Sequence, residues 1–408
     1  MPTALLVLSV LGLAAGLNAV RPVRWTPLVL ASFFAAWLTA ELAPQLAVLT
    51  VVAAGTLVAL GGARGTTGTV AVVVTVVDLA VLGWHIRSGQ RAAAAADGAL
   101  AGFPDQPAHP DHEATSLVRR FFVPMAFTHP DVERIVDVPY GEGSRHKLDV
   151  YRHRDRPTGC PTLVQVHGGG WVIGDKREQG RPLMLHLASR GWVCFAPNYR
   201  LSPRATFPDH LVDVKRALAW VREHGAEYGA DPGFLVITGG SAGGHLAALA
   251  ALTPGLPEYQ PGFEDADTSV SACVPYYGVY DLLGETGTPA AKWRRRRLLE
   301  RLVFKSTDPA VLEQASPLSR VHAGAPAFLV VHGRNDTLAP VQEARLLVER
   351  LRAVSHQPVL YLELPGTQHA FDVFPSIRSA HVVRAVGRFV ELVRQRHLAG
   401  VRPPDPGR

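Results

Sequence analysis

The stretch "FLVITGGSAGGHLAALAAL", residues 234–252, places one serine among four glycines between two apolar segments. Residues 234–240 form a short run with β-branched side chains, which predicts a buried strand. Residues 242–252 are rich in alanine and leucine, which favours a helix. Because glycines permit a tight turn and a close approach of the two elements, Ser241 is expected at a strand–turn–helix junction with its hydroxyl exposed.

The same glycine pattern does not fit a nucleotide-binding loop. A phosphate-binding loop would read G-x-x-x-x-G-K-S/T, and no lysine follows these glycines. A dinucleotide loop would require G-x-G-x-x-G near the start of its domain and an acidic residue on the next strand. The pattern G-x-S-x-G over residues 239–243 instead indicates a nucleophilic serine, although this short motif is only moderately specific on its own.

Strand–helix alternation surrounds the junction from about residue 132 to residue 398. The predicted helices 208–225, 340–354 and 377–395 are amphipathic. The other predicted strands cover residues 134–141, 146–152, 161–170, 192–200, 271–278, 327–336 and 358–366. This order predicts an α/β fold with a mainly parallel sheet, whose functional residues gather at the carboxyl ends of the strands. Residues 281–318 interrupt the alternation and are expected to form a helical cap over that edge.

Three further features follow predicted strands. The loop "HGGGW", residues 167–171, can present backbone N–H groups to an oxyanion, together with the N–H of Ala242. Asp336 ends "HGRND" and His369 follows the last strand, so the chain order is serine, aspartate, histidine. In this arrangement His369 would accept the Ser241 proton, and Asp336 would orient the imidazole. Asp281 and Asp372 are the alternative acids.

Residues 132–398 resemble an α/β-hydrolase of the hormone-sensitive-lipase and feruloyl-esterase-like carboxylesterase group, and are similar to actinobacterial esterases that carry an N-terminal membrane segment. The matching stretches are "VHGGGWVIGDK", "APNYRLSP", "FPDHLVDVKRAL", "GGSAGGHLAAL", "HGRNDTLAPV" and "GTQHAFDVFPS". The resemblance implies an eight-stranded sheet, hydrolysis of short or medium acyl esters, no metal or organic cofactor, and oxyanion donors at Gly169, Gly170 and Ala242. Many relatives have aspartate where this chain has Gly240, so hydrogen bonding around the turn is expected to differ.

The apolar excess of the chain lies at its N-terminal end. Mean hydropathy is +0.11 and charged residues make up only 19% of the chain. Four nearly uncharged runs approach the roughly 20 residues that a membrane-spanning helix needs. They cover residues 4–20, 27–39, 46–61 and 70–84. This predicts a bundle of three or four transmembrane helices in a multi-pass protein of the bacterial cell membrane. The second run is short and ends at Glu41, and Asp78 within the last run is interpreted as structural.

The arginines between these runs bear on orientation. With four spans, Arg21, Arg24 and Arg64 would lie on one side of the membrane, and Arg87, Arg91 and the catalytic domain on the other. Arginine is enriched on the cytoplasmic side, so three against two favours an extracytoplasmic catalytic domain. Three spans would reverse this expectation.

The domain boundaries expected from these patterns are a transmembrane segment over 1–87, a linker or surface helix over 88–130, a catalytic domain over 131–400 and a disordered tail over 401–408. The run "WRRRRLL", residues 293–299, is interpreted as a solvated helix face or a contact with anionic lipid headgroups. Cys194 and Cys273 are expected to be buried free thiols. No nucleic-acid motif accompanies the basic residues, and the sequence does not indicate an oligomeric state.

The leading functional hypothesis is a membrane-anchored serine carboxylesterase or lipase acting on a small-molecule acyl ester through Ser241. An amidase or acyltransferase could use the same three side chains and would differ only in the group that accepts the acyl moiety. A non-enzymatic ligand-binding protein of the same fold is disfavoured because Ser241, Asp336 and His369 are all present.

Overall fold

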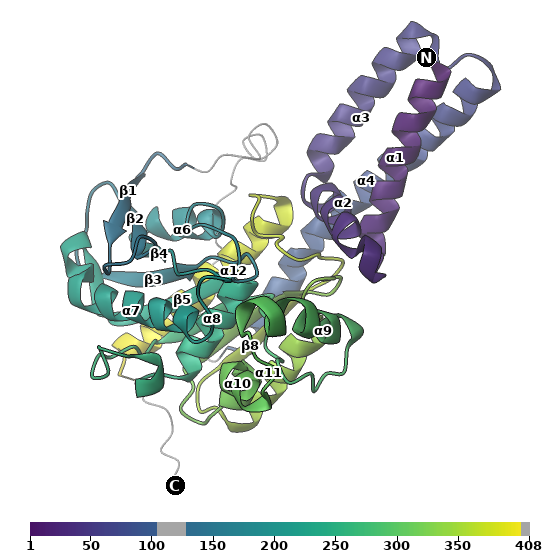
Figure 1. Ribbon diagram of the computed structural model, residues 1–408. Coiled ribbons are helices and arrows are strands. Elements are labelled where there is room, and N and C mark those ends of the chain that lie inside the picture. Colours follow the sequence, from purple (N-terminus) through teal and green to yellow (C-terminus); the bar gives the residue numbers. More distant parts are fainter. Residues whose placement is uncertain (104–127, 401–408) are drawn as a thin grey trace.

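The computed structural model describes residues 1–103 and 128–400, and places an elongated helical bundle against a unit built around one sheet (Figure 1). The strands are β1 (Val132–Pro139), β2 (Lys147–His153), β3 (Cys160–Val166), β4 (Val193–Pro197), β5 (Ala230–Gly240), β6 (Ala272–Tyr276), β7 (Ala327–Gly333) and β8 (Val359–Leu364). Their spatial order is β1-β2-β4-β3-β5-β6-β7-β8, with β2 antiparallel to both neighbours and the other pairs parallel. The predicted mainly parallel eight-stranded sheet is confirmed.

Helices cover both faces of the sheet because its central strands are apolar on both sides. Along β5, Leu235 and Ile237 pack into one hydrophobic cluster, and Phe234 and Val236 pack into the other. The first cluster includes side chains from α7 (Asp209–His224), α8 (Ala242–Leu252) and α11 (Val341–Val354). The second includes side chains from α6 (Arg181–Ala188), α12 (Ile377–Leu398) and the C-terminal part of α4 (Gly65–Leu100).

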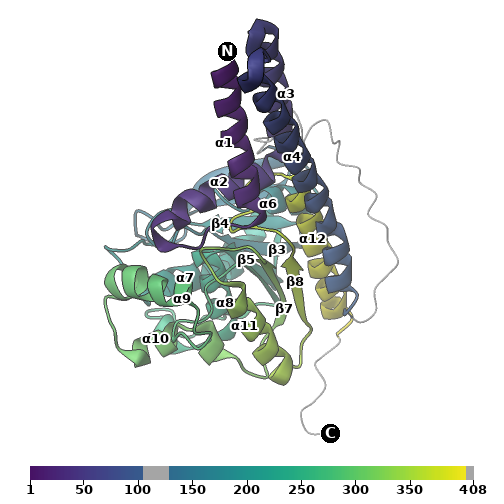
Figure 2. The same ribbon diagram turned by 90° about the vertical axis from the view of Figure 1, so that its right-hand side faces the viewer.

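Three N-terminal helices are long and apolar enough to cross a membrane. They are α1 (Pro2–Val20), α3 (Ala43–Leu57) with its π-helical continuation η2 (Val58–Gly62), and α4. The remaining predicted span is the 13-residue helix α2 (Val29–Glu41), which is shorter than the roughly 20 residues that a span requires. It lies at the end of the bundle beside the sheet unit (Figures 1 and 2).

Helix α4 continues through residues 88–100, the first part of the segment expected to be a linker or surface helix. Ala92, Ala96 and Leu100 repeat every four residues and are buried in the cluster that contains α12, and the two helices run side by side in Figure 2. An ion pair of 3.0 Å between Asp97 and Arg388 joins them as well. The rest of the expected linker, residues 104–127, and the expected disordered tail, residues 401–408, lie outside the described residues.

The predicted helical cap comprises α9 (Pro289–Arg294), the π-helical η5 (Arg295–Val303) and α10 (Pro309–Ala315). The arginine run is not a uniformly solvated face, because Arg294 is buried and pairs with Glu343 at 2.5 Å. Arg296 and Arg297 are exposed. Cys194 and Cys273 are buried and free, as predicted.

Candidate functional site

Ser241 lies at the turn between β5 and α8 and has a backbone conformation that side chains rarely adopt, with φ of 59° and ψ of −120°. The surrounding packing enforces this turn. A Cβ atom at Gly243 would lie 2.2 Å from the carbonyl oxygen of Val166 and 2.6 Å from that of His167, so only glycine fits. The N–H of Ala242 belongs to the first turn of α8, where helices leave amide groups unpaired.

The glycine loop after β3 lies directly against Ser241. A Cβ atom at Gly168 would be 3.2 Å from Cβ of Ser241, and the Gly168 amide donates to Gln179 Oε1 at 2.7 Å. Gly169 and Gly170 have φ values of 112° and 62°, which favour glycine. Among the described residues, neither of these two amides donates to a protein acceptor. Both are therefore available to a bound oxygen atom.

His369 and Asp336 form a buried pair. His369 Nδ1 lies 2.6 Å from Asp336 Oδ2, while Asp336 Oδ1 accepts hydrogen bonds of 2.8 Å from the amides of Leu338 and Ala339. His332 Nε2 lies 3.4 Å from the same carboxylate. Burial acts to raise the pKa of Asp336, but the interactions with His369 and His332 outweigh it and hold that pKa below its usual value. The carboxylate is thus charged at neutral pH and orients the imidazole.

The two alternative acids have other partners. Asp281 accepts the amides of Gly284, Glu285 and Thr286 at 2.7–3.0 Å, so it closes the loop before the cap. Asp372 accepts the hydroxyl of Tyr277, and burial raises its pKa. The geometry therefore favours Asp336 as the partner of His369.

Ser241 and His369 line one cavity of about 720 Å³. Within the described part of the chain, no hydrogen bond joins the Ser241 hydroxyl to the imidazole. Such bonds are often long in the absence of substrate and tighten when it binds. The cavity walls come from the glycine loop, the cap and α2. Their apolar side chains include Val29, Leu30, Phe33, Phe34, Trp37, Ile173, Trp293 and Leu298.

Helix α2 is the part of the site that the sequence did not reveal. The Phe33 ring meets the His369 ring edge-on at 6.3 Å, and Trp37 Nε1 donates a 2.8 Å hydrogen bond to the Ala370 carbonyl. Trp37 also packs on Phe374 with 5.0 Å between ring centroids. Two features of the sequence could have indicated this role: the apolar run is short, and two of its aromatic residues are four apart. Both features are also compatible with a membrane span.

A buried ion pair fixes α2 on the start of α12, the helix that follows the loop that carries His369. Glu41 accepts a hydrogen bond from the guanidinium of Arg378 and one of 2.6 Å from the hydroxyl of Ser376. Asn335, next to Asp336, donates to the Val20 carbonyl at 3.0 Å. The N-terminal helices thus contact both loops that form the histidine–aspartate pair. The Gln368 side chain connects these two loops, because its oxygen accepts hydrogen bonds from the amides of Thr337 and His369. The Tyr277 ring packs against the His369 ring.

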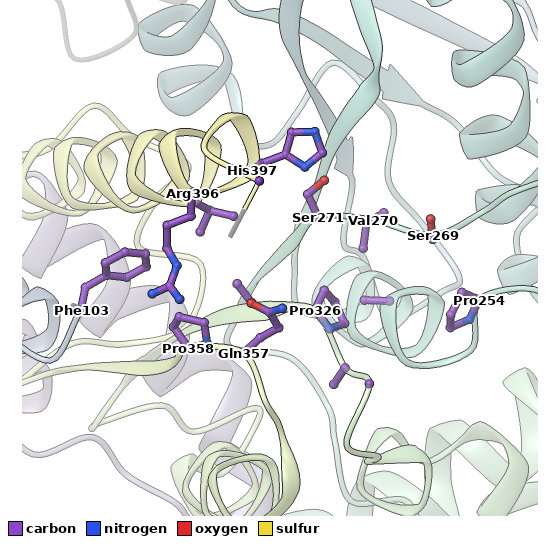
Figure 3. A pocket seen from close by; sticks show the side chains of 16 residues that line it. Phe103, Pro254, Ser269, Val270, Ser271, Pro326, Gln357, Pro358, Arg396 and His397 are labelled. Atoms are coloured by element: carbon purple, nitrogen blue, oxygen red, sulfur yellow. The ribbon is translucent and has the colours of Figure 1, made fainter. Parts of the chain in front are cut away.

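A second cavity, of about 400 Å³, lies at the opposite edge of the sheet (Figure 3). It is lined by Ser271 and Pro326, which precede β6 and β7, by Pro358, which precedes β8, and by Arg396 and His397 at the end of α12. Because residues before parallel strands and residues after them occupy opposite edges, this cavity is separate from the one that contains Ser241.

Comparison with known proteins assigns the family. Residues 148–351, half of the chain, match the family model described as BD-FAE. The chain belongs to the BD-FAE family. This confirms the resemblance to the hormone-sensitive-lipase and feruloyl-esterase-like carboxylesterase group. The BD-FAE match contains the glycine loop, Ser241 and Asp336 but ends before His369, so the histidine is identified by its geometry.

Curated relatives and a solved structure agree with the BD-FAE assignment. The chain is 54% identical over 275 residues to the "Probable carboxylic ester hydrolase LipM" of Mycobacterium tuberculosis, covering 65% of this chain and 63% of LipM. It is 47% identical to "Esterase LipQ" of the same organism, over 64% of this chain and 63% of LipQ. The chain therefore spans less than two thirds of the length of either relative. The propionate-bound esterase Est2 of Thermogutta terrifontis is 28% identical with a TM-score of 0.52, over 68% of this chain and 97% of that one.

Proposed function

We propose that this protein is a membrane-anchored serine carboxylesterase or lipase that hydrolyses short- to medium-chain acyl esters. The observation that carries the proposal is the position of Ser241, which lies on a strained turn and lines the same cavity as His369, the partner of Asp336. The names of LipM and LipQ support a reaction on carboxylic esters.

The proposed reaction has two steps. His369 accepts the proton of the Ser241 hydroxyl as its oxygen attacks the ester carbonyl, and the amides of Gly169, Gly170 and Ala242 stabilise the resulting oxyanion. Collapse breaks the acyl C–O bond, and His369 returns the proton to the leaving alcohol. Water, deprotonated by His369, then attacks the acyl-enzyme. The bond between the acyl carbon and Ser241 Oγ breaks, His369 returns the proton to that oxygen, and the carboxylic acid is released.

We further propose that α1, α3 and α4 anchor the enzyme with its catalytic domain on the cytoplasmic side. The contacts of α2 with the His369 loop and with the start of α12 support placing α2 on the same side as that domain, which leaves three crossings. Arg21, Arg24, Arg87 and Arg91 then share the catalytic side, and Arg64 lies opposite. Four arginines on the catalytic side against one on the other favour a cytoplasmic catalytic domain, because the cytoplasmic side is enriched in arginine. This is the reverse of the orientation expected with four spans. Protease should reach the domain in inverted membrane vesicles and not in intact spheroplasts, and the opposite pattern would contradict this orientation.

The catalytic assignment is tested with purified full-length protein in detergent. Ser241→Ala should abolish hydrolysis of p-nitrophenyl butyrate and labelling by a fluorophosphonate, with an unchanged unfolding transition. Ser189→Ala, which alters the serine that follows α6 and lies outside the cavity, serves as the matched control and should retain both. Retained turnover in Ser241→Ala would overturn the proposal.

A further inference from the structure

The opening of the catalytic cavity is bordered by large apolar side chains that are exposed. Leu30 and Phe34 of α2 are 55% and 51% exposed, Ile173, which follows the glycine loop, is 69% exposed, and Trp293 of the cap is 42% exposed. All four line the cavity that contains Ser241. Single exposed apolar residues are ordinary, but several around one opening mark a surface that meets an apolar partner.

The position of α2 indicates that this partner is lipid. One face of the helix is buried against the protein through Val29, Phe33 and Ala36, while Leu30, Phe34 and Leu38 lie on the exposed face four residues apart. The polar side chains of α2 are buried against the protein, and every exposed side chain of the helix is apolar, so its exposed face is not suited to water. It lies where the bundle of candidate spans meets the catalytic domain, and the exposed Trp25 precedes it, as aromatic residues do at membrane interfaces (Figure 2).

Two guanidinium groups lie at the same opening. Arg24, which precedes α2, and Arg297 of the cap both line the cavity and are exposed. Within the described part of the chain neither forms an ion pair, whereas Arg294 is neutralised by Glu343. Glu178 also lines the cavity, so the free charges at the opening are two positive and one negative.

We propose that the enzyme takes acyl-ester lipids with an anionic head group directly from the bilayer. An acyl chain enters between α2 and the cap, the ester carbonyl reaches Ser241, and the phosphate of the head group stays at the rim with Arg24 and Arg297. Hydrolysis breaks the acyl C–O bond and yields a fatty acid and the deacylated lipid. This inference rests on the proposed esterase function and adds its substrate class. A cavity of about 720 Å³ lies in the size range of sites for small ligands.

The test uses the full-length enzyme reconstituted in vesicles of phosphatidylglycerol, which is anionic, or of phosphatidylcholine, which is zwitterionic. Release of fatty acid is measured for each, and Ser241→Ala sets the background. We expect faster release from phosphatidylglycerol. The double variant Arg24→Gln/Arg297→Gln should lower this preference by about tenfold, because each charged hydrogen bond to the phosphate is lost.

The double variant Arg21→Gln/Arg296→Gln is the matched control. It removes the same charge from exposed arginines of the same two segments that do not line the cavity, and should keep the preference. An unchanged preference in Arg24→Gln/Arg297→Gln would overturn the head-group assignment. Hydrolysis of p-nitrophenyl butyrate without release of fatty acid from either vesicle would overturn the lipid inference and leave the esterase function standing. If the unaltered enzyme neither hydrolysed p-nitrophenyl butyrate nor released fatty acid from vesicles, the esterase function itself would be refuted.

Discussion

Gly240, the residue before the proposed nucleophile, provides a quantitative test of the packing around the site. A Cβ atom added at this position would lie 2.7 Å from the Tyr277 hydroxyl and 3.1 Å from the Cε2 and Cζ atoms of that ring. Tyr277 is 1% exposed, its hydroxyl donates to Asp372, and its ring centroid is 4.5 Å from that of His369. Tyr277 therefore fills the space that the side chain of an aspartate, which the family resemblance implies at this position, would enter.

The Gly240→Ala substitution forces Tyr277 to move, and overpacking of this kind costs about 1–3 kcal/mol. Tyr277→Phe removes the atom in the closest contact but leaves the buried Asp372 without its donor, which costs about 1–3 kcal/mol by itself. In the double variant the remaining 3.1 Å contacts need only a small shift. The two substitutions should therefore be less costly together than the sum of their separate effects, by about 1–2 kcal/mol.

The measurement is a double-mutant cycle on the free energy of unfolding in urea, with kcat/KM for p-nitrophenyl butyrate measured on the same preparations. Gly240→Ala should also lower kcat/KM, because displacement of Tyr277 disturbs the His369 ring that it contacts. Additive stability effects, within about 0.5 kcal/mol, would refute the argument that Tyr277 excludes a side chain at position 240.

Three further predictions address other parts of the molecule. Asp336→Asn should lower kcat for p-nitrophenyl butyrate by about three to four orders of magnitude, because an amide cannot stabilise the imidazolium form, and a loss below tenfold would contradict its role. Trp37→Phe keeps an aromatic ring but loses the hydrogen bond to the Ala370 carbonyl, so kcat/KM should fall about fivefold, equivalent to about 1 kcal/mol, and an unchanged value would remove α2 from the positioning of the histidine loop. Burial lowers the pKa of His245 to about 4. Below pH 6.5 this imidazole therefore binds a proton in the unfolded chain but stays neutral in the folded chain until the pH approaches 4. Stability should therefore decline as the pH falls from about 6.5 to 4, by up to about 3 kcal/mol from this residue, and a flat profile of unfolding temperature in wild type, or the same slope in His245→Asn, would contradict it.

The sequence alone determined the elements and their order. Each of the eight strands lies within or overlaps a predicted apolar run, because the pattern of side chains that must be buried is local and is written directly in neighbouring residues. The turn at Ser241 was also predictable, since Gly239 and Gly243 are required by close backbone contacts that accompany this kind of strand–helix junction. Asp336 and His369 could be selected because they follow strands whose carboxyl ends share one edge of a parallel sheet.

Only the tertiary structure decided what touches these residues from distant parts of the chain. Residues 27–39 have the composition of a membrane span, yet α2 packs on the His369 loop and forms a wall of the cavity, through contacts between residues more than 300 positions apart. The role of Gly240 likewise depended on Tyr277, and the burial of Arg294 depended on Glu343. Composition and periodicity determine which faces must be covered, whereas the partner that covers each face depends on how the whole chain packs.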